Sequence, residues 1–325
     1  MAGTLWFGLM TALLTERYAV NIIRSIPVLT LSYALFLFLS CILIFAYPAM
    51  RFKTHNSFEN THRFAGWAAV ALFWAELILI VVAFANNTQI PFTQVLIREP
   101  AFWILIAITL NIIYPWLRLR HVRVVPEKLS DHALRIHFPQ KLQPFSGFAI
   151  ADEPLGEWHP FAIFPDEHGG SSLIVSNAGD WTKKTIMNPQ TSYWIRGSPK
   201  AGVLSMTCLF KSCVVVATGS GIGPCLAFRA APWNKTACRM LWSTPSPLKT
   251  YGQGVVDLVH EIDREAVIID TRTAGRPNVV EIAYRLYVKS GAEAVFVISN
   301  PKLTRKVIYD MESRGVPAFG PIWDS

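Results

Sequence analysis

A glycine-rich segment in the C-terminal third carries the residue types with the clearest chemistry. It reads Thr218, Gly219, Ser220, Gly221, Ile222, Gly223 and Pro224, directly after an apolar run and before a helical stretch. Backbone N–H groups at the start of a helix bind anions, and glycine lets a pyrophosphate approach because it has no Cβ. The spacing Gly-x-Gly-x-Gly-Pro differs from the standard dinucleotide fingerprint. Its place between a strand and a helix predicts nucleotide binding, with an ordinary turn as the alternative.

Two kinds of element would position this segment. In residues 200–325, expected strands at 213–217, 240–243, 266–269 and 294–299 alternate with expected helices at 255–263, 279–290 and 302–313. This alternation predicts a parallel, doubly wound α/β sheet. In residues 118–199, short strands are expected at 121–125, 133–138, 160–164 and 172–175, separated by turns rich in Pro, Gly and Asp. Strands of this length and spacing predict a small antiparallel β-barrel.

The first 117 residues have a different composition. The chain is 52% hydrophobic and only 16% charged, and the deficit of charge is concentrated here. Three apolar runs, 28–50, 64–85 and 101–117, have the length of membrane-spanning helices, so we expect the lipid bilayer as a partner. The apolar stretch 3–14 is too short to span and predicts an interfacial helix or a signal-like segment.

The loops predict the orientation of a multi-pass membrane protein. Arg51, Lys53 and Arg63 lie between the first two runs, and Arg118, Arg120 and Arg123 follow the third. Positive charge is retained on the cytoplasmic side, so the C-terminal part is expected in the cytosol. Which membrane is occupied does not follow from the sequence.

One carboxylate, Glu76, interrupts the second apolar run. A carboxylate inside a bilayer marks a proton or ligand site, or it is a neutral acid hydrogen-bonded to a neighbouring helix. Membrane haem requires histidines facing one another within the helices, and none of the three runs contains a histidine. We therefore expect no haem.

The charge and the cysteines exclude other classes of partner. The net charge of +8 comes without a Lys/Arg run that would follow phosphates, so no nucleic-acid partner is expected. The five cysteines form no CxxC pair, and their spacing fits neither a disulfide framework nor a structural zinc site. No metal ligands are predicted.

Four motifs in order resemble the ferredoxin–NADP reductase superfamily, in its membrane-attached ferric reductase and NADPH oxidase branch. They are the segments 157–162 (EWHPFA), 179–184 (GDWTKK), 218–224 (TGSGIGP) and 275–278 (GRPN). The whole chain also resembles a fungal group in which a few membrane helices precede such a unit, including C-terminal regions of adenylate-forming, peptide-synthetase-like enzymes. The resemblance implies a flavin-binding barrel followed by a nucleotide-binding half.

The resemblance assigns roles to residues by motif. His159, Pro160 and Phe161 would line the isoalloxazine of FAD. The segment with Trp181 and Thr182 would hold its pyrophosphate through backbone amides and the Thr182 hydroxyl, with Lys183 or Lys184 supplying charge. The glycine segment, with Thr218, Gly219, Ser220, Gly221, Gly223 and Pro224, would bind NADPH or NADH. Arg276 would face the adenosine end, and together with Lys249 it favours NADPH. At the C-terminus, Phe319 or Trp323 would cover the flavin or pack in the core.

Two positions depart from the family pattern. Ala162 stands where the family has a hydroxyl near the flavin N5, and Ser299, before Asn300 and Pro301, stands where the family has a cysteine. No catalytic residue is therefore assigned. The sequence favours a membrane-bound flavin-dependent NAD(P)H oxidoreductase that passes electrons to an unknown acceptor. The alternative is a membrane regulatory protein with a degenerate nucleotide-binding domain.

Overall fold

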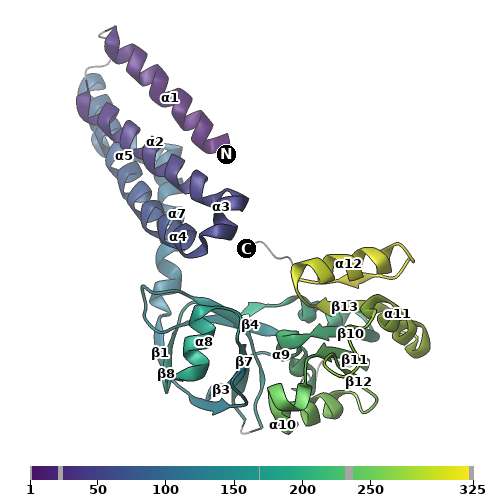
Figure 1. Cartoon of the computed structure of the whole chain (residues 1–325). Helices are drawn as coiled ribbons and strands as arrows, with labels where there is room; N and C mark the ends of the chain where they lie inside the picture. Colours follow the sequence, from purple (N-terminus) through teal and green to yellow (C-terminus); the bar gives the residue numbers. More distant parts are fainter. Residues whose placement is uncertain (1, 21–24, 168, 231–236, 322–325) are drawn as a thin grey trace. The chain divides into compact units, whose positions relative to one another are not determined.

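The computed structural model describes residues 2–20, 25–167, 169–230 and 237–321 and divides the chain into two compact units, residues 1–114 and 115–324 (Figure 1). The first unit is helical. Its elements are α1 (Ala2–Ala19), α2 (Ile26–Ala46), α3 (Pro48–Lys53), α4 (His55–Asn60), the π-helical turn η1 (Thr61–Ala65), α5 (Gly66–Thr88), α6 (Phe92–Arg98) and α7 (Pro100–Leu117).

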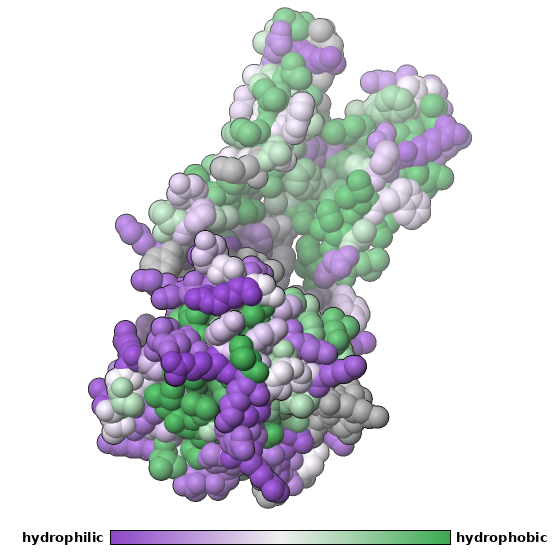
Figure 2. All heavy atoms as spheres, turned by 90° about the vertical axis from the view of Figure 1, so that its right-hand side faces the viewer, coloured by the Kyte–Doolittle hydropathy of each residue, from purple (hydrophilic) through white to green (hydrophobic). Residues whose placement is uncertain are grey.

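Three helical stretches are long and apolar enough to cross a bilayer: Ile26–Ala46, Ser57–Thr88 and Pro100–Leu117. Their outward faces carry large apolar side chains such as Leu37, Phe84 and Leu110, and Figure 2 shows the hydrophobic surface of these helices. The three runs predicted from composition are therefore present as helices, with different ends. The segment at 3–14 belongs to α1, which extends to Ala19.

The differences at the helix ends have local causes. The first stretch ends at Ala46 instead of 50 because Pro48 forces Tyr47 into an extended conformation, with ψ of 132°, and starts the separate α3. The second stretch begins at Ser57 instead of 64 because no proline interrupts the chain there and η1 continues the helix. His62 therefore lies within this helix, whereas the predicted span excluded it.

A polar contact joins α2 to α5 inside the first unit. The Ser32 hydroxyl donates a hydrogen bond to Glu76 Oε1 at 2.5 Å, and both side chains are buried. The hydroxyl also lies 3.0 Å from the Val28 carbonyl oxygen on its own helix. This bond fits the second of the two interpretations of Glu76, an acid that is hydrogen-bonded to a neighbouring helix.

The second unit begins with two antiparallel sheets packed face to face, in the region where a small antiparallel barrel was predicted, residues 118–199. One sheet has the order β1-β8-β4-β5, with β9 paired to β4, and the other has the order β2-β3-β7-β6. The strands are β1 (Arg120–Arg123), β2 (Val125–Lys128), β3 (Ala133–Phe138), β4 (Ser146–Ala151), β5 (His159–Ala162), β6 (Phe164–Pro165), β7 (Ser171–Ser176), β8 (Ser192–Ile195) and β9 (Lys200–Ala201). Ile150 and Tyr193 of the first sheet meet Ile136 and Leu173 of the second in one core. Helix α8 (Asp180–Met187) adds Ile186 to this core.

A parallel sheet with the order β12-β11-β10-β13-β14 forms the remainder, as the alternation of strands and helices predicted. Its strands are β10 (Ser212–Thr218), β11 (Ala237–Thr244), β12 (Val267–Asp270), β13 (Ala294–Ile298) and β14 (Ala318–Phe319). The central strand β10 alternates: Val215 packs with α10 (Pro247–Ile262) on one face, and Val214 packs with α11 (Val279–Ser290) and α12 (Pro301–Glu312) on the other. Burial on both faces explains why residues 213–217 of β10 are all apolar.

We expect Ser32→Ala to destabilise the helical unit, because the buried Glu76 carboxyl loses the hydroxyl that donates to it. Loss of a partner for a buried polar group costs about 1–3 kcal/mol. Thermal unfolding of the detergent-solubilised chain would show a lower midpoint. Glu76→Gln keeps an oxygen that accepts from Ser32 and should be milder, and Thr30→Ala, an exposed change on the same helix, serves as control. An unchanged midpoint for Ser32→Ala would contradict this.

Candidate nucleotide-binding cleft

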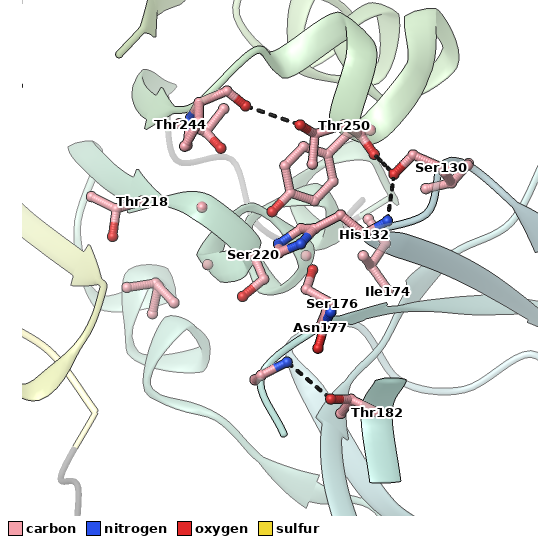
Figure 3. A pocket seen from close by; sticks show the side chains of 18 of the residues that line it. Ser130, His132, Ile174, Ser176, Asn177, Thr182, Thr218, Ser220, Thr244 and Thr250 are labelled. Atoms are coloured by element: carbon pink, nitrogen blue, oxygen red, sulfur yellow. Dashed lines mark hydrogen bonds between the residues drawn. The ribbon is translucent and has the colours of Figure 1, made fainter. Parts of the chain in front are cut away.

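A cleft of about 1480 Å³ lies in the second unit between the antiparallel sheets and the parallel sheet (Figure 3). Its parallel-sheet side is formed where β10, β11, β12 and β13 end, at the edge where ligands bind in doubly wound folds. The glycine segment supplies the floor of this side through Thr218, Gly219, Ser220, Gly221, Gly223 and Pro224. The opposite side is formed by β5, the end of β7 and the first turn of α8.

The glycine segment is fixed by close packing. Gly219 has φ of +53°, in the left-handed region that favours glycine. A Cβ on residue 221 would stand 2.2 Å from the carbonyl oxygen of Ile298, so only glycine fits between β10 and the end of β13. The Trp242 indole N–H donates to the Gly219 carbonyl oxygen at 3.0 Å, and the Cys225 thiol donates to that of Gly221 at 3.2 Å. These contacts hold the backbone of the glycine segment in place at the surface of the cleft.

Strand β5 gives the cleft an apolar wall. Pro160, Phe161 and Ala162 line it, and Ile174 of β7 adds to the same side. His159 does not line the cleft, because its ring stacks on Trp181 with centroids 4.0 Å apart and planes at 21°. The stack joins the first turn of α8 to β5. His159 and Trp181, both predicted to contact FAD, therefore pack against each other.

Thr182 is the member of the 179–184 motif that reaches the cleft. Its hydroxyl oxygen accepts from the backbone N–H groups of Ala178 and Gly179 at 2.9 Å and donates to the Gly179 carbonyl oxygen at 2.9 Å. Thr182 thus orders the turn that starts α8. Lys183 is exposed and lies outside the cleft.

Ser299 faces the glycine segment from the end of β13. Its hydroxyl and that of Thr218 are 2.5 Å apart, and Ser299 is buried. The following Asn300 caps α12, since its side-chain oxygen accepts from the Leu303 N–H at 3.0 Å. The segment that replaces the family's cysteine therefore connects two strand ends and begins a helix.

Two basic residues, Lys249 and Arg272, line the end of the cleft that the segments after β11 and β12 form. Arg276, predicted from the 275–278 motif, is exposed and lies outside it. Asp270 holds this end together, because its Oδ1 accepts from the backbone N–H groups of Ser246 and Arg272, each at 2.8 Å. These two hydrogen bonds hold the pKa of the Asp270 carboxyl below its ordinary value, so the contact persists down to acidic pH.

Further residues reach the cleft without having been predicted there, including His132, Ser176, Ser246, Tyr251 and Arg272. Burial raises the pKa of the Tyr251 hydroxyl, which therefore stays neutral. The sequence did contain a signal for Arg272: it follows the predicted strand at 266–269, and loops at the carboxyl ends of parallel strands form ligand-binding sites. Phe319 packs on Phe296 in β13, as the core interpretation required, and Trp323 lies outside the described residues.

Comparisons with known proteins find similarity to proteins that are named reductases. The family described as "Adenylate-forming reductase 03009, C-terminal domain" matches residues 203–325. Two curated proteins of Coprinopsis cinerea, adenylate-forming reductases 03009 and 06235, are 44% and 43% identical to this chain. Each comparison covers all of this chain and 32% of the relative, so the chain spans about a third of their length.

Solved structures resemble the fold at low sequence identity. Full-length CYP116B46 from Tepidiphilus thermophilus has a TM-score of 0.50 and 15% identity over 62% of this chain and 28% of its own. A ferredoxin-NADP+ reductase mutant from Plasmodium falciparum, in complex with 2'P-AMP, has a TM-score of 0.49 and 11% identity over 64% and 98%. The first of these likenesses supports a shared fold for the second unit and nothing beyond the fold.

We expect Gly221→Ala to weaken binding of NADP+ by more than tenfold, because the added Cβ must displace the turn from the Ile298 carbonyl. Isothermal titration of the purified chain measures this. Gly254→Ala is the matched control: it lies on α10, has no atom within 4 Å of its added Cβ, and does not line the cleft. Equal affinity for the two variants would contradict the assignment of the turn to nucleotide binding.

Proposed function

We propose that this chain is a membrane-anchored NAD(P)H oxidoreductase that binds the dinucleotide on the glycine segment and a flavin against β5. The observation that carries the proposal is the contact of Gly221 with the Ile298 carbonyl oxygen, which only glycine allows and which holds the turn, whose residues line the cleft, at the carboxyl edge of the sheet. The glycine segment lies at the carboxyl edge of a parallel sheet and opposite an apolar wall, the arrangement expected for a dinucleotide.

The residues of the antiparallel-sheet side of the cleft fit FAD in part. Pro160, Phe161 and Ile174 offer an apolar face to a planar ring, and Thr182 orders the adjoining turn. Ala162 offers no hydroxyl to such a ring. When bound, FAD would accept a hydride from NAD(P)H and release electrons singly or in pairs to an acceptor. The contribution of this chain is to place the two ligands against each other and to exclude water.

The names of the relatives support reductive chemistry. Two proteins called adenylate-forming reductases are similar over the whole of this chain, which corresponds to about a third of each of them. The three apolar helices support attachment to a bilayer, and the arginines after Leu117 favour a cytosolic position for the second unit. The acceptor is an unidentified partner.

A regulatory protein that binds nucleotide without turnover is the second candidate. Two observations favour it: Ala162 has no hydroxyl, and the hydroxyl of Ser299, in place of the family's cysteine, is engaged with Thr218. Such a protein would respond to the reduction state or concentration of the nucleotide.

The visible spectrum of the detergent-purified chain separates the two candidates. For the oxidoreductase we expect a bound flavin band that bleaches on anaerobic addition of NADPH. Ala162→Thr restores the hydroxyl of the family pattern and should accelerate the bleaching several-fold. Protein that binds no FAD after reconstitution would overturn the oxidoreductase. Bound flavin that NADPH fails to reduce would favour the regulator.

Selectivity for NADPH is expected to depend on Lys249 and Arg272. Both are basic side chains in the cleft, where a 2'-phosphate would gain charge-assisted hydrogen bonds. Arg272→Ala should weaken NADP+ binding by about tenfold or more, consistent with the roughly 1.5–3 kcal/mol typical of a hydrogen bond to a charged group, and change NAD+ binding little. Arg276→Ala, four residues away and outside the cleft, is the control. Equal losses for both nucleotides would contradict a 2'-phosphate contact.

A further inference from the structure

His132 is the one histidine that lines the cleft among the residues described by the structure. It lies in the turn between β2 and β3, and its side chain is exposed. In Figure 3 the imidazole points into the cleft, toward Ser220 of the glycine segment. A titratable side chain from the antiparallel sheets thus faces the predicted phosphate-binding turn from the other side.

The turn that carries His132 is held on three sides. The His132 N–H and the Ala133 N–H both donate to the Ser130 hydroxyl oxygen, at 3.0 and 3.1 Å. The Asn177 N–H donates to the His132 carbonyl oxygen at 2.9 Å, and the Ser130 hydroxyl donates to the Thr250 carbonyl oxygen of α10 at 2.7 Å. These bonds satisfy backbone groups and leave the imidazole directed into the cleft.

We propose that His132 donates a hydrogen bond to a phosphate oxygen of the nucleotide bound on the glycine segment. This inference rests on the proposed function and adds a specific contact from the opposite wall. An imidazole gains its proton in the pH range between about 5 and 8, and a protonated donor forms a stronger hydrogen bond to an anionic oxygen. Nucleotide affinity therefore rises as the pH falls.

The other charged groups around His132 do not produce the same pH dependence. Lys128 and Asp131 of the same turn are paired at 2.7 Å, and this pairing lowers the pKa of the Asp131 carboxyl. Across the cleft, the described residues with charged or titratable side chains are Lys249 and Tyr251 of α10 and Arg272 after β12. Burial raises the pKa of Tyr251, and lysine and arginine keep their protons near neutrality.

The test measures binding of ADP-ribose to the full detergent-purified chain at pH 6 and pH 8. The pyrophosphate of ADP-ribose does not titrate in this range, unlike a 2'-phosphate, whose second pKa is near 6. We expect the wild type to bind at least threefold more tightly at pH 6. The His132→Asn variant should bind ADP-ribose with the same affinity at pH 6 and pH 8, close to the weaker wild-type value at pH 8. The His132→Lys variant should also bind equally at both pH values, close to the tighter wild-type value at pH 6.

His260→Asn is the matched control, because His260 is an exposed histidine at the end of α10 that does not line the cleft. It should keep the wild-type pH dependence. If His132→Asn also keeps it while Gly221→Ala abolishes binding, the His132 contact is refuted and the proposed nucleotide site stands. If the wild type fails to bind both ADP-ribose and NADP+, both proposals are refuted.

Discussion

The packing of Gly221 against the Ile298 carbonyl oxygen determines where the glycine turn lies. β10 and β13 are parallel neighbours, so their carboxyl ends meet at this point, and the missing Cβ allows the turn to approach the end of the adjacent strand. The indole of Trp242 and the thiol of Cys225 then hold the two carbonyl groups of the turn. The loops after β11 and β12 and the wall formed by β5 all face the space that this packing leaves open.

Elements with a strong local signal were predictable from the sequence. The helix at 279–290 and the strand at 133–138 were predicted to the residue, because one is amphipathic and capped and the other alternates. β4 was missed because it consists largely of small residues and is fixed by pairing with β5, β8 and β9. α8 was missed because it has eight residues and buries only Thr185 and Ile186.

The composition of the cleft depends on tertiary structure that no motif spacing contains. Arg272 and Arg276 are four residues apart in the same loop, and the turn held by Asp270 places only the first in the cleft. The position of His159 also depends on tertiary structure. Its motif predicted a contact with a ligand, whereas in the structure its ring stacks on Trp181 of α8. The position of the glycine segment in the cleft was predictable, because a turn between a strand and a helix depends on backbone geometry that glycine itself permits.

The hydrogen bond from Ser130 to the Thr250 carbonyl oxygen joins the two walls of the cleft at one end. The two sides are also joined by a shared apolar core, in which Phe164 and Ile174 pack with Leu226. Thr250 lies two residues before Gly252, where the α10 backbone departs from helical geometry with φ of +80°. A change in the backbone of α10 at this point would therefore be felt by the turn that carries His132, through the Ser130 hydroxyl.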